Sequence, residues 1–385
     1  MTGFAIKGWC PSALRPMPSG DGLVVRVRPR GGRLSCGQAT GIAALAARHG
    51  NGRIDLTGRA NLQIRGVSEA SHGPLIEGLD RLGLVDADLQ SESQRNILVD
   101  PFWIHGDDTH SLATELEQAL AAHSLGLPEK CGFAVDCGTE RVLAQAPADI
   151  RIERSADGRL IVRADGVSLG RVVRKAQAID TVLALAEWFV ASGGVTDGRG
   201  RMAAHVARKI RLPFEGDTRP AISAATPGPD IVATGALVGI AFGQLDSVAL
   251  ADVAMLTPGL RLTPWRMILL EGLQEMPRHD NLITRSDDPL LRVIACTGAP
   301  LCPEAHAETR ALAATLAPHI PADTRLHVSG CAKGCAHPAP SALTLVGTAD
   351  GFDLVRDGSP RDTPAMRGLA PEKVVGAAGM LLEGR

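Results

Sequence analysis

The pattern of apolar and polar positions predicts a small β-α-β-β unit near the start of the chain. Residues 22–28 alternate between apolar and polar side chains, which is typical of a strand. A helix is expected over 35–49, because Ser35 and Gln38 form a capping box and Gly50 marks the end. Two short strands complete the unit, at 53–57 and 61–66. Arginines that alternate along the first strand are expected to form its solvated face, at 26, 28 and 30.

The same order of elements is predicted again in the second half of the chain. Its members are a strand at 236–242, a helix at 246–256, and strands at 260–263 and 267–271. Residues 56–66 align without a gap against residues 262–272, although few identities result. The polar Arg59 and Gln63 of the first copy are apolar in the second copy. If the repeat is a true duplication, the first copy carries the polar site.

Each small unit is followed by a larger region that mixes strands with helices. A stretch rich in proline and glycine separates the two halves, at 213–230. In the first half, helices are expected at 109–123 and 177–192, and strands at 132–137, 149–154 and 160–164. In the second half, strands are expected at 292–295, 325–328 and 342–346, and helices at 304–316 and from 371 onward. The fold class predicted is therefore α+β with an internal duplication.

Four cysteines near the C-terminus carry the strongest chemical signal in the chain. Cys296 and Cys302 have five residues between them. After a further 28 residues come Cys331 and Cys335, with three between them. Two thiolate pairs on loops that follow predicted strands can hold one 4Fe–4S cluster, which usually takes four cysteine ligands. Glycines beside the ligands would let backbone N–H groups turn toward the sulfur atoms, at 298, 330 and 334.

Structural zinc and a disulfide framework are the alternative roles for these cysteines. Structural zinc sites favour ligand pairs about two to four residues apart, which fits Cys331 and Cys335 but not the wider first pair. A disulfide framework suits small secreted domains, whereas this chain has 385 residues and no expected signal peptide. The cluster accounts for both spacings and makes the chain a candidate redox protein.

Composition narrows the class of protein. Hydrophobic residues make up 45% and charged residues 21% of the chain, as in a globular protein with more than one domain. No apolar run is long enough to span a bilayer, and we expect a cytoplasmic location. The formal net charge of −2 and the aromatic content of 3% argue against general nucleic-acid binding.

The cysteine pairs, the duplicated halves and a scattered basic set together resemble the sulfite and nitrite reductase family. Essentially the whole chain is covered, and further specific marks lie at 56–63, 95–96 and 127–130. The resemblance implies paired ferredoxin-like half-domains and two larger α+β domains related by a pseudo-two-fold axis. The implied boundaries are 1–90 and 231–280 for the half-domains, 91–212 and 281–385 for the α+β domains, and 213–230 for the linker.

The resemblance also implies roles for individual residues. Members of this family hold a 4Fe–4S cluster that one cysteine, matched here by Cys335, bridges to sirohaem. The remaining cluster ligands would be Cys296, Cys302 and Cys331. Side chains of the first half would line the macrocycle pocket, namely Arg59, Asn61, Gln63, Arg95, Asn96 and Lys130. The first three recur at every second position, so they would share one face of a strand.

One position departs from the reductases. They carry a second lysine two residues after the one matched by Lys130, but this chain has Gly132 there. The missing cation argues against sulfite or nitrite as the substrate, because such sites stabilise the reacting oxyanion electrostatically. Strings at 8–11, 15–17, 20–22 and 132–136 instead resemble one branch of the family, the precorrin-3B synthases of aerobic cobalamin biosynthesis.

That branch implies an O2-dependent monooxygenase that hydroxylates precorrin-3A and closes a γ-lactone with electrons from NADH. No nicotinamide-binding glycine fingerprint is evident, so the electrons would arrive through a partner reductase. The branch also implies a mononuclear non-haem iron, for which neither His105 with Asp107 nor His337 forms a recognisable ligand set. Two alternatives stay open, namely a sirohaem-dependent sulfite or nitrite reductase and a non-catalytic tetrapyrrole-binding or electron-transfer subunit.

Overall fold

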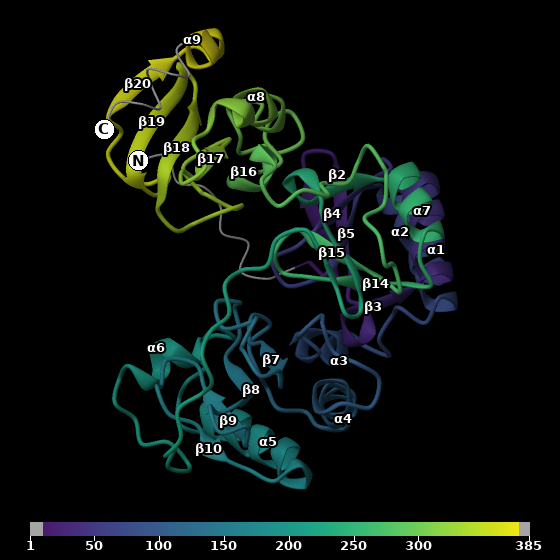
Figure 1. The fold of residues 1–385 in the computed structure, drawn as a ribbon, viewed down its shortest axis with the longest axis vertical. Helices are drawn as coiled ribbons and strands as arrows, with labels where there is room; N and C mark the ends of the chain where they lie inside the picture. The colour runs from purple at the N-terminus through teal and green to yellow at the C-terminus, as the bar shows by residue number, and fades with distance from the viewer. Residues whose placement is uncertain (1–10, 377–385) are drawn as a thin grey trace.

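The computed structural model describes residues 11–376, and this part of the chain contains four five-stranded sheets. The larger regions lie at opposite ends of the view in Figure 1, residues 91–212 at the bottom and the C-terminal region at the upper left. The two small units lie side by side on the right. No helix among these described residues is long and apolar enough to cross a membrane.

The first small unit has the predicted β-α-β-β order with additions at both ends. Its elements are β1 Met17–Ser19, β2 Gly22–Val27, β3 Arg33–Ser35, α1 Cys36–His49, β4 Arg53–Leu56, β5 Leu62–Val67 and α2 Glu69–Arg81. The predicted capping box is confirmed at the start of α1. The Ser35 hydroxyl accepts from the Gln38 N–H at 3.1 Å, and the Gln38 side chain accepts from the Ser35 N–H at 3.0 Å.

The second small unit repeats the first in its backbone geometry. Its elements are β11 Asp230–Val232, β12 Gly235–Gly239, β13 Gln244–Asp246, α7 Ser247–Met255, β14 Gly259–Leu262 and β15 Met267–Glu271. Ala60 and Arg266 are equivalent in the gapless alignment, and both have positive φ, 52° and 60°. The hydroxyls of Thr57 and Thr263 each accept from the N–H two residues on, at 3.3 Å in both copies. The expected duplication is therefore visible in the turns as well as in the order of elements.

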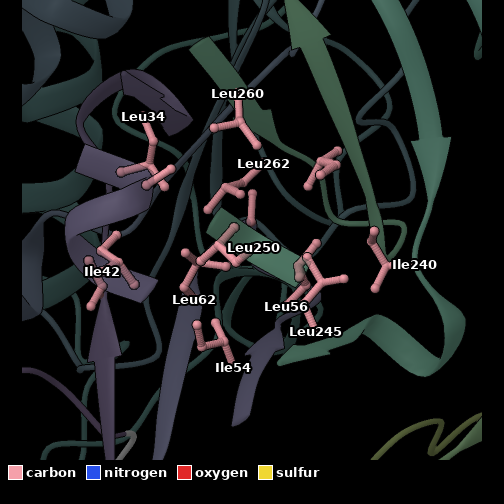
Figure 2. Close-up of a cluster of buried hydrophobic side chains, with 14 of the residues drawn as sticks. Leu34, Ile42, Ile54, Leu56, Leu62, Ile240, Leu245, Leu250, Leu260 and Leu262 are labelled. Atoms are coloured by element: carbon pink, nitrogen blue, oxygen red, sulfur yellow. The ribbon is translucent and has the colours of Figure 1, made fainter. Parts of the chain in front are cut away.

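The two small units exchange an edge strand, which the sequence did not predict. Strand β3 pairs with β14, with Leu34 opposite Leu260, and β13 pairs with β4, with Leu245 opposite Ile54. The resulting sheet orders are β1-β2-β5-β4-β13 and β11-β12-β15-β14-β3. Helices α1 and α7 pack together over them. Figure 2 shows leucine and isoleucine side chains of both units meeting in one core.

The two larger regions share one sheet topology. The first contains α3 Leu89–Gln94, β6 Ile97–Val99, α4 Asp108–Ala122, β7 Phe133–Asp136, β8 Ile150–Arg154, β9 Leu160–Ala164, β10 Arg171–Val172, α5 Lys175–Ala191 and α6 Met202–Val206. The second contains β16 Val293–Ala295, α8 Arg310–Leu316, β17 Leu326–Ser329, β18 Ser341–Thr348, β19 Gly351–Gly358, β20 Met366–Leu369 and α9 Pro371–Gly376. In each sheet the first three strands are parallel and the next two antiparallel.

The loops that precede β7 and β17 are equivalent, residue by residue. The carbonyl of Pro128 accepts from the N–H three residues on at 2.8 Å, and the carbonyl of Pro321 does the same at 3.1 Å. The carbonyl of Gly132 accepts at 3.2 Å from the N–H of Ile150, the first residue of the parallel strand β8. The carbonyl of Arg325 accepts at 3.2 Å from the N–H of Leu343, the third residue of the parallel strand β18. Gly132 of the first copy therefore corresponds to Arg325 of the second.

One expectation about a single element is wrong. The helix expected at 304–316 begins only at Arg310, because the N–H groups of Ala305 and His306 bond to Cys302 and Gly330 instead of continuing a helix. The final helix does begin at Pro371, but its expected apolar positions beyond 376 lie outside the described residues. The same is true of residues 8–10 in the string that resembles one family branch.

The first strand does not have the expected solvated arginine face. Arg26 and Arg28 are only 8% and 5% exposed, although Arg30 is exposed as predicted. Arg28 donates to the backbone carbonyl of Glu92 and lies 3.7 Å from the carboxylate of the same residue. The expectation fails because Glu92 of α3 supplies an acidic partner to Arg28, which the local alternation of residues does not reveal.

The linker at 213–230 does not cross open space. Its residues Thr218, Pro220 and Ser223 form isolated bridges to the first large region.

Separate hydrophobic clusters fill the two larger regions, whereas the two small units share one cluster. The domain boundaries stay a prediction, and the shared cluster indicates that the small units fold as one body.

Candidate functional site

The two cysteine loops leave the same edge of one sheet. Cys296 follows β16 and Cys331 follows β17, and these strands are parallel neighbours. The N–H of His306 donates to the carbonyl of Gly330 at 2.8 Å and so joins the loops. A side chain on Gly330 would start only 2.7 Å from the Cβ of Ala305, so the close approach of the loops requires glycine. The fold therefore brings the two predicted ligand pairs together.

The four sulfur atoms share one electrostatic environment. The N–H at position 330 donates to the Cys296 sulfur at 3.2 Å, as expected for a glycine beside a ligand. Burial raises the pKa of the Cys331 thiol, and negative charge on the thiolates at 296 and 302 raises it further. The pKa of Cys335 is raised by partial burial and then by the other three thiolates, while the ammonium of Lys333 lowers it. Bound iron would relieve this mutual repulsion, because metal ions take thiolate ligands.

The cysteine arrangement is compatible with the predicted 4Fe–4S cluster, which stays a prediction. The seven cysteines in the described part of the chain are free thiols, so none of them forms a disulfide. Within residues 11–376, no three His, Cys, Asp or Glu side chains converge closely enough for a single metal ion. A zinc ion would need its sulfur ligands about 2.3 Å away, whereas a cubane binds each thiolate through a different iron and spreads them more widely.

Arg59 lies on a turn, not on the strand where we expected it. Strand β4 ends at Leu56 and β5 begins at Leu62, so Arg59 does not share a strand face with Gln63. From the turn, Nη2 of Arg59 donates to the carbonyl of Lys130 at 3.1 Å. The turn therefore carries this guanidinium across to the loop that precedes β7.

Three of the predicted pocket residues gather around Gly132. The amide of Asn96 donates to the carbonyl of Cys131 at 2.9 Å, so the Asn96 side chain lies against the loop that also carries Lys130. A side chain on Gly132 would start 3.2 Å from the Asn96 amide nitrogen and 3.5 Å from a guanidinium nitrogen of Arg59. The position that lacks the second lysine of the reductases therefore faces Arg59 and Asn96.

The other predicted pocket residues do not join this group. Arg95 is buried, and its guanidinium donates to both carboxylate oxygens of Asp86 at 2.8 Å. Asn61 is buried just before β5, and Gln63 lies within that strand, opposite Arg26 and Asp55 in the sheet. A direct contact of these three residues with a ligand stays a prediction.

Comparisons with known proteins identify the family of this chain. A precorrin-3B synthase from Sinorhizobium sp is 32% identical, and the match covers 93% of this chain and 84% of that protein. The chain belongs to the precorrin-3B synthase branch of the nitrite and sulfite reductase family. A family model described as "Nitrite/Sulfite reductase ferredoxin-like half domain" matches residues 15–82 of this branch member.

More distant relatives of this precorrin-3B synthase homologue are reductases. A ferredoxin–nitrite reductase from Leptolyngbya laminosa is 23% identical, over 91% of this chain and 82% of that protein. The solved structure of the Mycobacterium tuberculosis NirA protein superposes with a TM-score of 0.60 at 17% identity, over 94% of this chain and 82% of that one. The structural match shows the α+β reductase fold.

A buried ionic network lies beside the cysteine loops of this family member, and no local sequence pattern indicates it. Arg65 donates to both carboxylate oxygens of Asp21, at 2.8 and 2.9 Å, and lies 3.3 Å from Asp55. Arg310, at the start of α8, bonds to the same Asp55 at 3.3 Å. The hydroxyl of Ser19 donates to the carbonyl at 301, inside the first cysteine loop. The network therefore ties the β1–β2 hairpin to the segment that presents Cys302.

A pair of buried acids lies at the far edge of the first large sheet. Asp100 follows β6 and Asp136 ends β7, the strand whose string resembles the precorrin-3B synthase branch. Burial raises the pKa of Asp136 to about 7, and the charge of Asp100 adds to the rise. Burial likewise raises the pKa of Asp100 to about 6. The folded protein therefore holds protons here that an unfolded chain would release.

This pair should make the fold less stable as the pH rises. An unfolded aspartate titrates near pH 4, so the stabilisation from the bound proton is complete below about pH 4 and lost by about pH 7. We expect the thermal midpoint to fall across this window, and Asp136→Asn to remove much of the fall. The control is Asp157→Asn, an exposed position whose carboxyl has a lowered pKa. An unchanged slope in Asp136→Asn would contradict the assignment.

Proposed function

We propose that the protein is a precorrin-3B synthase, an O2-dependent monooxygenase that hydroxylates precorrin-3A and closes a γ-lactone. One atom of O2 would enter the product and the other would leave as water, with an electron pair from NADH and two protons. The observation that carries the proposal is the 32% identity to such an enzyme over nearly the whole chain. In this proposal the cysteine loops would hold the electron-transfer cluster, and the turn that carries Arg59 would bind the substrate.

Gly132 supports a tetrapyrrole substrate over a small oxyanion. The reductases share a lysine at the position of Gly132. In this chain the glycine leaves the space beside Arg59 and Asn96 without a side chain. Precorrin-3A carries a ring of acetate and propionate arms, and arginine forks bind carboxylates with paired hydrogen bonds. Arg59 and Lys130 would orient one such arm, because they already meet across two parts of the fold.

The four cysteines would hold the 4Fe–4S cluster, with Cys335 nearest the substrate because it is the most exposed of them. When bound, the cluster would supply electrons one at a time for O2 activation. The N–H groups at the loop glycines would stabilise the ligand sulfurs, and Lys333 would offset their negative charge. The NADH electrons would reach the cluster through a partner reductase. A mononuclear iron is left unassigned, since no ligand set for it exists among the described residues.

The decisive experiment follows the oxygen atom. Anaerobically purified enzyme, reduced and mixed with precorrin-3A and labelled O2, should give a hydroxylated lactone that carries the label by mass spectrometry. A product without the label would end the monooxygenase proposal. Sirohaem absorbance together with the cluster, and sulfite or nitrite turnover, would favour the reductase function of the relatives instead. Macrocycle binding without turnover by any donor would indicate a non-catalytic subunit.

Arg59→Ala should keep the cluster but weaken binding of the macrocycle. Loss of a charged hydrogen bond to a carboxylate costs about 1–3 kcal/mol of binding free energy. The dissociation constant of precorrin-3A can be measured by anaerobic titration, with iron content determined on the same samples. Arg53→Ala is the matched control, because Arg53 is exposed on the same small unit. Equal affinity in Arg59→Ala and the wild type would refute this placement of the pocket.

A further inference from the structure

The second copy of the fold carries two arginines, one at the place of Gly132 and one on the turn that corresponds to the Arg59 turn of the first copy. Arg325 stands where the first copy has Gly132, with the same carbonyl hydrogen bond at 3.2 Å. Arg266 stands on the equivalent turn, one residue beyond the place of Arg59. The two turns approach each other, since a side chain on Gly58 would start 4.0 Å from the carbonyl of Pro264. Arg59 and Arg266 therefore lie on adjoining turns of the two copies.

The positive charges of the second site have little to neutralise them. Burial lowers the pKa of Arg266 to about 10, and the charges of Arg325 and Arg310 lower it further. Asp55 bonds to Arg310, but it is already shared with Arg65. The side chain of Arg325 is exposed and makes no hydrogen bond or ion pair to any residue between 11 and 376, and the side chain of Arg266 donates there only to the carbonyl at 293.

A buried histidine beside these arginines also lacks partners. His327, on β17, has no exposed surface, and neither ring nitrogen is hydrogen-bonded in the described part of the protein. The ring of His337 lies 5.8 Å away, edge to face. Burial lowers the pKa of His327 to about 4, and the neighbouring positive charges act in the same direction, so the ring is neutral and keeps one N–H to donate. A buried polar group of this kind normally has a partner.

We propose that Arg266 and Arg325, with the N–H of His327 behind them, form a second anion site that binds a carboxylate or phosphate group. Guanidinium groups match the paired oxygens of such ligands. A divalent metal is disfavoured, because the charges of Arg266 and Arg325 act on the two histidines and no carboxylate joins them among the described residues. This site does not depend on the proposed function. The anion has two conceivable sources, an arm of the macrocycle or a free oxyanion.

The first arm of the test uses inorganic phosphate and succinate as probes at constant ionic strength. Calorimetry on the full chain should show binding that Arg325→Met and Arg266→Met weaken at least about tenfold, as for loss of a charged hydrogen bond. Arg48→Met removes the same charge from an exposed position on α1 and should bind like the wild type. Equal affinities in all variants, or an equal loss in Arg48→Met, would overturn the site. If Arg325→Met fails to fold, Arg325→Lys replaces it, with a smaller but measurable loss expected.

The second arm identifies the source of the anion. If Arg325→Met also weakens anaerobic binding of precorrin-3A, the site holds an arm of the macrocycle, and if only phosphate binding is lost, it holds a free oxyanion. If the wild-type protein binds phosphate but not the macrocycle, the proposed function is refuted and the proposal of an anion site is still supported. His327→Asn provides the last check. Loss of bound iron in this variant with unchanged phosphate affinity would show a metal site and overturn the proposal.

Discussion

Cys302→Ser is expected to remove the iron–sulfur cluster and all oxidative turnover with it. Serine offers a harder and more weakly acidic ligand than the thiolate that iron–sulfur clusters select. The loop around Cys302 depends on the ligand, because its backbone is held by single hydrogen bonds, to Gly298 at 2.9 Å and from Ala305 at 3.1 Å. Since metal binding contributes to folding of such loops, soluble yield should fall as well.

Iron and sulfide analysis of anaerobically purified protein measures this effect directly. Cys36→Ser is the matched control, since Cys36 is a half-buried free thiol on α1, far along the chain from the cysteine loops. The control should keep the full iron and sulfide content and an unchanged electron paramagnetic resonance spectrum. A Cys302→Ser protein with the same iron and sulfide content as the wild type would show that the four cysteines are not the cluster ligands.

Arg65→Met should destabilise the junction between the small units and the C-terminal region by about 3–5 kcal/mol, as for breaking one side of a buried ion pair. The methionine fills much of the same volume but leaves Asp21 and Asp55 without their shared partner. Both carboxylates lie in the protein interior, with 4% and 11% of their side chains exposed. The uncompensated charge of Asp21 produces most of the cost, because Asp55 keeps its contact with Arg310 at 3.3 Å.

Urea denaturation monitored by tryptophan fluorescence gives the change in unfolding free energy. Arg285→Met is the control, because Arg285 also binds an aspartate at 2.7 Å but both partners are mostly exposed, 76% and 68%. Exposed pairs contribute about 0–1 kcal/mol, so the control should stay within that range. Equal losses in the two variants would mean that the network is not a determinant of stability.

The sequence predicted those parts of the fold that depend on neighbouring residues. The capping box of α1, the strands β4 and β15, and the repeat at 56–66 all follow from local spacing or direct alignment, and each is present. The family assignment, which began from cysteine spacing and short strings, is confirmed by the 32% identity over most of the chain. Short-range patterns were sufficient for these features because each is encoded within a few residues.

Features that depend on distant segments were not predictable in the same way. Strands β3 and β13 have three residues each, too few to show a period, and each pairs with a strand of the other half of the chain. Arg26 and Arg28 alternate like surface residues, but both are buried, and α3 supplies an acidic partner to Arg28. Arg59 has the period of a strand but sits on a turn. The roles of the pocket residues stay predictions, because a ligand contact is not encoded in either pattern.

The reciprocal strands also bear on how this architecture arose. A single ancestral unit without its exchanged strand would have had an open sheet edge, which two identical chains could close by lending each other β3 and its counterpart. In such a homodimer every amino-acid substitution appears in both subunits. Fusion into one polypeptide would remove that constraint while keeping both edges closed. Each copy could then change by itself, as the four cysteines that only the second half carries in this arrangement illustrate, while the backbone keeps the shared order of strands.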